Sequence, residues 1–118
     1  MARWLPNLAF EATQAFLALP EPPDAVFCAS DVMAIGAMAA IEAAGLRVPD
    51  DMAVVGFDDI DYARLVTPSL TTVRQSQDAM ADELIGAMLH LLEHPDESPT
   101  ASVVPVELIV RESAGAAK

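Results

Sequence analysis

Hydrophobic residues along this chain form two kinds of segment. Apolar residues recur with helical spacing over about residues 8–19, 32–44 and 76–93. Short apolar or β-branched runs, typical of strands, occupy residues 24–29, 52–57, 70–73 and 102–110. A loop over residues 60–69 and a fraying tail from residue 111 complete the prediction. This order predicts an α/β fold of three layers, in which helices flank a small, mostly parallel sheet.

The helix predicted at residues 32–44 is apolar on nearly all sides, because Glu42 is its only charged residue. A surface helix that packs on a sheet normally has one polar face. This helix therefore needs two burial partners: its own sheet, and either a second molecule or a part of the same protein that is missing from this chain. Gly36 and the alanines would permit a close approach. We expect an oligomer contact here, and simple burial in the core is the alternative.

Acidic residues follow two of the predicted strands. Asp58 and Asp59 come directly after the run Val-Val-Gly-Phe, and Ser30 and Asp31 follow the preceding strand. In open α/β sheets, ligands bind outside the carboxyl ends of the strands. Carboxylates at that edge accept hydrogen bonds from ligand hydroxyls, as in the recognition of sugars and nucleosides. They also cap turns in a purely structural role, and the pattern alone leaves both interpretations open.

Known catalytic patterns do not fit these acids. A phospho-acceptor domain needs a lysine at a later strand end, but Lys118, in the tail, is the only lysine. Phosphate loops, nucleophile elbows and HExxH are also missing from the sequence. His90 and His94 have the i, i+4 spacing of metal ligands, but cations that end a helix are the commoner reason and the sequence suggests no third ligand. We therefore predict a protein that is not an enzyme and that binds no cofactor or metal.

Charge and cysteine content narrow the possible partners. The 118 residues include 18 acidic and 6 basic side chains, which gives a formal net charge of −12, and the cations are scattered. Nucleic-acid binders group their cations, so this chain alone should bind neither DNA nor an anionic membrane. The single cysteine, Cys28, excludes an internal disulfide and has the surroundings of a buried residue. Without a signal-like or membrane-spanning segment, we expect a cytoplasmic location.

Several linked motifs resemble the lactose-repressor/galactose-repressor family of bacterial transcription regulators. They are residues 24–38 (DAVFCASDVMAIGAM), 45–51 (GLRVPDD), 54–59 (VVGFDD), 67–75 (TPSLTTVRQ) and 105–113 (PVELIVRES). The family implies a helix-turn-helix domain, a hinge and an effector-binding core of two lobes that resemble periplasmic sugar-binding proteins. The chain corresponds to the last third of such a protein.

The resemblance places most of the chain in the second lobe of that core, over about residues 8–75 and 102–115. Residues 76–94 would form a helix that belongs to the first lobe in relatives. Because most of that lobe is missing here, we expect the apolar side of the helix to dock on its own lobe or on another chain.

The resemblance also implies two sets of functional residues. The predicted ligand-binding residues are Asp58, Ser30, Asp31, Gln75 and Trp4, with Asp58 as the principal acceptor of ligand hydroxyls or ring nitrogens. The predicted dimer interface combines the apolar helix with the following loop, through Val32, Ile35, Gly36, Ala39, Tyr62 and Val66.

Together these features predict the effector-sensing and dimerisation lobe of a transcription regulator that responds to a sugar or another small metabolite. The expected partners are that effector and a second copy of the chain. One alternative is a fragment of a periplasmic-type sugar-binding protein, which is typically monomeric and keeps the face of the dimer helix polar. A small α/β enzyme is a further alternative.

Overall fold

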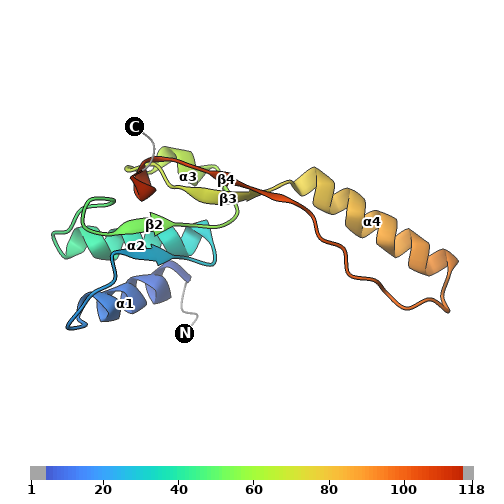
Figure 1. Cartoon of the computed structure of the whole chain (residues 1–118), viewed down its shortest axis with the longest axis horizontal. Coiled ribbons are helices and arrows are strands. Elements are labelled where there is room, and N and C mark those ends of the chain that lie inside the picture. Colours follow the sequence, from blue (N-terminus) through green and yellow to red (C-terminus); the bar gives the residue numbers. More distant parts are fainter. Residues whose placement is uncertain (1–4, 116–118) are drawn as a thin grey trace. The chain divides into compact units, whose positions relative to one another are not determined.

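The computed structural model describes residues 5–115, which divide into two compact units. The first unit holds residues up to 74 together with those from 108 onward, and the second holds residues 75–107. The elements in chain order are α1 (Leu5–Leu17), β1 (Ala25–Phe27), α2 (Asp31–Ala43), β2 (Ala53–Val55), α3 (Tyr62–Leu65), β3 (Thr72–Gln75), α4 (Gln77–Glu93), β4 (Val106–Ile109) and the 3₁₀ helix η1 (Glu112–Ala114) (Figure 1).

Parallel pairing dominates the first unit. β1 pairs with β2 in parallel, with Ala25 opposite Ala53 and Phe27 opposite Val55. Beyond β2, the parallel pattern continues through single bridges from Val55 to Thr71 and from Asp58 to Arg74. β3 pairs in turn with β4. The α/β class is therefore confirmed, but the described strands form two small sheets of two strands each and are shorter than the predicted runs.

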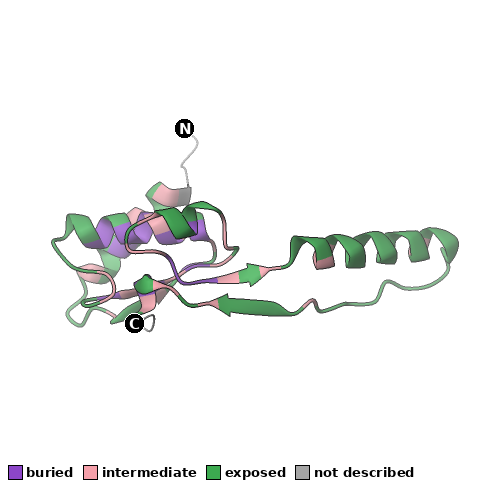
Figure 2. Ribbon diagram, turned by 90° about the horizontal axis from the view of Figure 1, so that it is seen from above, coloured by how far each residue is buried: buried purple, intermediate pink, exposed green. Residues whose placement is uncertain are grey.

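Helix α2 lies at the centre of the core and contacts both α1 and β2 (Figure 1). Its buried side chains belong to a cluster that includes Ile41 from the helix and Val54 and Leu70 from the strand segments. Figure 2 shows the buried residues of the chain concentrated along this helix. Helix α2 also packs closely against α1, because a Cβ added at Gly36 would lie 2.3 Å from the carbonyl oxygen of Pro6. Helix α1 is thus a second burial partner for α2 within the same chain.

Two elements were not predicted. α3 forms inside the segment expected to be a loop, and its Ala63 is fully buried. η1 forms in the tail that was expected to fray, which makes that prediction wrong for residues 111–115. The Ser113 hydroxyl is fully buried; it donates to Val54 O at 2.6 Å and accepts from Thr71 N at 2.8 Å. These bonds fix the tail to the strands.

The second unit consists of α4 and the segment that returns to β4. Ser76 caps the helix by accepting from Ala79 N at 3.2 Å, and Asp78 lies in its first turn, where a negative charge complements the helix dipole. No residue of α4 is buried, and Leu84 and Leu92 are 66% and 72% exposed. Within the second unit, the described residues leave the apolar side of this helix exposed; its docking on its own lobe or on another chain stays a prediction. Among the described residues, no helix is long and apolar enough to cross a membrane.

Candidate functional site

The loop that follows β2 has an unusual backbone at its two acids. Asp58 has a φ angle of 122° and Asp59 a φ angle of 56°, both in the region that favours glycine. Such residues cost about 1–3 kcal/mol each and persist only where the surrounding structure holds them. The holding contacts are hydrogen bonds from Asp58 N to Val73 O at 2.9 Å and from Asp59 N to Thr72 Oγ1 at 3.3 Å. The loop is thus fixed from the neighbouring strand.

Asp31 holds the same loop from the other side. Its carboxylate is fully buried, with Oδ2 accepting from Ile60 N at 2.8 Å and Oδ1 accepting from the Thr72 hydroxyl at 2.5 Å. Its own amide donates to Phe57 O at 2.9 Å. Gly56 leaves room for this carboxylate, because an added Cβ would lie 2.3 Å from Asp31 Oδ1. Asp31 is therefore a framework residue in this structure, and a direct contact with a ligand would require these bonds to rearrange.

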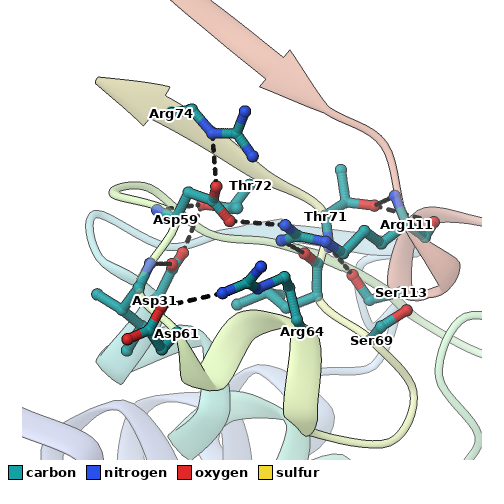
Figure 3. Close-up of polar contacts among 12 residues, drawn as sticks. Asp31, Asp59, Asp61, Arg64, Ser69, Thr71, Thr72, Arg74, Arg111 and Ser113 are labelled. Atoms are coloured by element: carbon teal, nitrogen blue, oxygen red, sulfur yellow. Dashed lines mark hydrogen bonds and ion pairs between the residues drawn. The ribbon is translucent and has the colours of Figure 1, made fainter. Parts of the chain in front are cut away.

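Asp59 is committed to two arginines, as Figure 3 shows. Its Oδ2 accepts from Arg74 Nε at 2.7 Å, and its Oδ1 lies 2.8 Å from Arg111 Nη2 as an ion pair. Burial raises the pKa of the Asp59 carboxyl, but the two guanidinium groups outweigh burial, so its pKa lies below the ordinary value. Both oxygens of this carboxylate face an arginine and its side chain is only 9% exposed, so it is poorly accessible to a ligand.

Asp58 differs from its neighbours, because it is the exposed acid at this edge of the sheet. The bond between Asp31 N and Phe57 O brings the ends of β1 and β2 together, so Ser30 and Asp58 follow adjacent strand ends. Ser30 is partly buried and caps α2 by accepting from Met33 N at 3.2 Å. That cap uses a lone pair of Oγ, so the hydroxyl hydrogen remains able to donate to another group.

Gln75 and Trp4 are the other two predicted ligand residues. Gln75 is the last residue of β3, is partly buried and falls in the second unit. Trp4 lies outside the described residues. Their contacts with a ligand stay predictions.

The predicted dimer residues differ in exposure. Tyr62 is 65% exposed, Val32 is 38% exposed, and Ala39 is also exposed. Ile35 and Val66 are partly buried. Gly36 is buried and packs against α1, so its lack of a side chain serves a contact within the chain, and its place in a dimer interface stays a prediction.

Sequence reasoning missed the polar network behind the loop. Thr72 contacts Asp31, and Arg74 and Arg111 hold Asp59, although Arg111 lies in the tail expected to fray. The adjacent acids at positions 58 and 59 gave a signal, because two neighbouring carboxylates rarely share one role. No pattern in the sequence indicated the arginine partners of Asp59.

Comparison with known proteins places the chain among regulators. A probable HTH-type transcriptional repressor, ExuR of Bacillus subtilis, is 46% identical over 106 residues, which are 88% of this chain and 31% of that protein. The HTH-type transcriptional repressor PurR of Escherichia coli O139:H28 is 38% identical over 108 residues, or 92% of this chain and 32% of the repressor. The chain thus spans about a third of the length of these curated relatives.

Solved structures of transcription regulators are also similar to this chain. The structure of the transcriptional regulator CelR in complex with cellobiose matches with a TM-score of 0.83 at 34% identity. The match covers 92% of this chain and 33% of the CelR chain. The lac repressor dimer bound to operator and the anti-inducer ONPF has a TM-score of 0.80 at 32% identity, with 92% and 32% covered. These relatives are regulators and not enzymes.

The family model described as a periplasmic binding protein-like domain matches residues 1–114, nearly the whole chain. This match and the repressor relatives confirm the resemblance that the motifs indicated. The chain belongs to the periplasmic binding protein-like domain family, in the form found in LacI-type transcription regulators.

Proposed function

We propose that this chain is the effector-sensing and dimerising lobe of a transcription regulator that responds to a sugar or a related small metabolite. The observation that carries the proposal is the exposure of Asp58 on a loop whose backbone is strained. Asp31 and Asp59 are engaged by the framework, while Asp58 is exposed on a loop that this framework holds in a strained conformation. Strain of this kind is typical of functional positions.

Hydroxyl-rich ligands suit the chemistry of this edge. An ionised carboxylate accepts hydrogen bonds from two neighbouring hydroxyls, and the Ser30 hydroxyl can donate to a third oxygen. Two relatives point to the same ligand class, because CelR is solved with cellobiose and a LacI family regulator from Lactobacillus casei, 32% identical, with sucrose. We do not expect catalysis here, because the neighbouring carboxylates are both engaged.

The ligand is tested by adding a panel of mono- and disaccharides and nucleosides to ¹⁵N-labelled protein and recording amide chemical shifts. A single lobe of a two-lobed effector-binding core is expected to bind its ligand weakly, so millimolar ligand is needed. The proposal predicts that at least one compound shifts the amides of residues 29–31 and 57–60 together, in a saturable manner. Shifts that are absent for every compound, or that appear only in α4, would contradict it.

Dimerisation is supported by apolar side chains exposed on α2 and α3. Val32 lies in the first turn of α2, and Tyr62 and Leu65, which is 73% exposed, lie on α3. Exposed apolar patches of this kind mark interaction surfaces. The lac repressor relative is solved as a dimer. The proposed partner is therefore a second copy of this chain, and DNA contacts would come from a part of the protein other than this acidic lobe.

Two exposed leucines allow a matched test of the interface. Leu65 lies on α3 and Leu92 on α4, at 73% and 72% exposure. Sedimentation equilibrium should give a dimer for the unmodified chain and for Leu92→Asp, and a dimer weakened at least tenfold for Leu65→Asp. A monomer at high concentration would overturn the proposed dimer and favour a transport-type sugar-binding protein. Weakening by Leu92→Asp alone would assign the association to α4.

A further inference from the structure

Three potential metal ligands meet at the carboxyl-terminal end of α4. His90 lies in the last turn of the helix, His94 is its C-cap residue, and Glu97 follows in the next turn. One ligand atom from each of the three side chains lies within 4.8 Å of the others. The helical spacing indicated the two histidines, and the structure adds the third ligand that the sequence alone did not suggest.

The backbone holds these residues in place. His94 N donates to His90 O at 2.9 Å, and Glu97 N donates to His94 O at 3.0 Å, so the helix end passes directly into a closed turn. The two imidazole rings are stacked, with centroids 4.4 Å apart and planes inclined by 27°. His90 Nε2 lies 2.5 Å from Glu97 Oε2, while His94 Nδ1 lies 3.1 Å from His90 O. The second histidine therefore keeps Nε2 available as a ligand.

These distances suit a small divalent ion after modest side-chain rotation. Zinc is bound at about 2.0–2.2 Å by imidazole nitrogen and carboxylate oxygen, which places tetrahedral ligand atoms about 3.3 Å apart. The His90 to Glu97 pair would open slightly and the wider separations would close. Both side chains are about half exposed, at 55% and 54%, and so have room to rotate. A recess of about 90 Å³ lined by His90 and Glu97 adjoins the site and leaves space for a water as fourth ligand.

The surrounding charge favours a cation. Residues 75–107 contain no lysine or arginine and seven acids, which are Asp78, Asp82, Glu83, Glu93, Asp96, Glu97 and Glu107. Two imidazoles and one carboxylate select zinc, cobalt, nickel or copper over magnesium and calcium, which prefer oxygen ligands alone. The carbonyl end of the helix dipole adds to the attraction.

We propose that His90, His94 and Glu97 bind a divalent transition ion of the zinc type, which ties the end of α4 to the turn that follows it. The ion would stabilise this turn by binding the folded form in preference to the unfolded one. The site is independent of the sugar-binding edge around Asp58, because all three ligands belong to the second unit. Neither proposal requires the other.

The test is calorimetric titration of the whole chain, free of any histidine tag, with Zn²⁺ alone. The unmodified protein should bind one ion with a dissociation constant in the micromolar range. His90→Ala, His94→Ala and Glu97→Gln should each weaken binding at least tenfold. The matched control Glu93→Gln, which removes a neighbouring exposed carboxylate, should change it less than twofold. Co²⁺ should give the intense visible absorption of a four-coordinate ion.

Three outcomes would overturn the proposal. Zn²⁺ affinity that is unchanged in His94→Ala would exclude the site, and Mg²⁺ binding as tight as Zn²⁺ would indicate general attraction to the acidic surface. Loss of binding in the histidine variants with unchanged affinity in Glu97→Gln would exclude the third ligand.

Discussion

The backbone amide of Ile60 donates a 2.8 Å hydrogen bond to the buried carboxylate of Asp31, which lies 29 residues earlier in the chain. The same carboxylate accepts from the Thr72 hydroxyl, so one side chain links the ends of three strand segments. The loop that carries Asp58 is thereby shaped by a residue that the sequence indicated as a ligand contact.

Asp31→Ala should destabilise the fold by about 2–4 kcal/mol. The substitution leaves the Ile60 amide and the Thr72 hydroxyl without their acceptor in a buried place, and unpaired buried donors cost about 1–3 kcal/mol each. Urea unfolding followed by circular dichroism measures the loss. Asp61→Ala is the control, since Asp61 is 90% exposed and should change stability by less than about 0.5 kcal/mol. Equal effects of the two substitutions would contradict the framework role.

Asp59 should contribute to acid sensitivity. Its pKa in the folded protein is depressed, so its contribution to stability is present above its unfolded-state pKa of about 3.9 and is lost as pH falls through the lower folded value. We expect the free energy of unfolding to fall less steeply below about pH 4 in Asp59→Asn than in the unmodified chain, which needs measurement from pH 7 to pH 2. A parallel decline in both proteins would contradict the ion pairs with Arg74 and Arg111.

Replacing each of two glycines by alanine should change the stability of the protein in opposite directions. Gly36→Ala places a Cβ 2.3 Å from the backbone oxygen of Pro6 and should destabilise by about 1–3 kcal/mol, because α1 must move away. Gly86→Ala, inside α4 with nothing within 4 Å, should stabilise that helix by about 0.5–1 kcal/mol. Thermal unfolding of both variants tests this. A neutral Gly36→Ala would mean that α1 does not pack closely on α2.

Asp58→Gly should separate stability from function. Glycine adopts a φ of 122° without the steric cost that aspartate has there, so stability should rise by about 1 kcal/mol while ligand binding is lost. Urea unfolding and the chemical-shift titration on the same sample give both values. A destabilised variant would mean that Asp58 serves the framework, as Asp31 does.

Periodicity was sufficient to predict the α/β class, helices α1, α2 and α4 and the approximate positions of the four strands, because apolar residues recur with a period that is characteristic of each kind of element. It failed for α3 and η1, which are too short to show a period and depend on contacts with distant residues. The buried Ser113 illustrates this, since its partners at Val54 and Thr71 are 59 and 42 residues away. The all-apolar character of α2 correctly indicated two burial partners, but one of them is α1 of the same chain.

The position of the acids after predicted strands identified them as candidate functional residues but did not distinguish their roles. Asp31, Asp58 and Asp59 have the same chemistry, and only burial and the arginines contributed from β3 and the tail distinguish them. Glu97 could not be predicted as a third metal ligand for a similar reason, because only the turn after α4 brings its side chain close to His90 and His94.

If Asp58 is the exposed acid that contacts the effector, its substitution should weaken binding and that of another exposed acid should not. With the best sugar or nucleoside from the panel, the dissociation constant is measured for the unmodified chain, for Asp58→Asn and for Asp24→Asn, an exposed acid before β1. Binding should be at least tenfold weaker in Asp58→Asn, about 1.4 kcal/mol or more, and unchanged in Asp24→Asn. Equal affinity in all three proteins would contradict it.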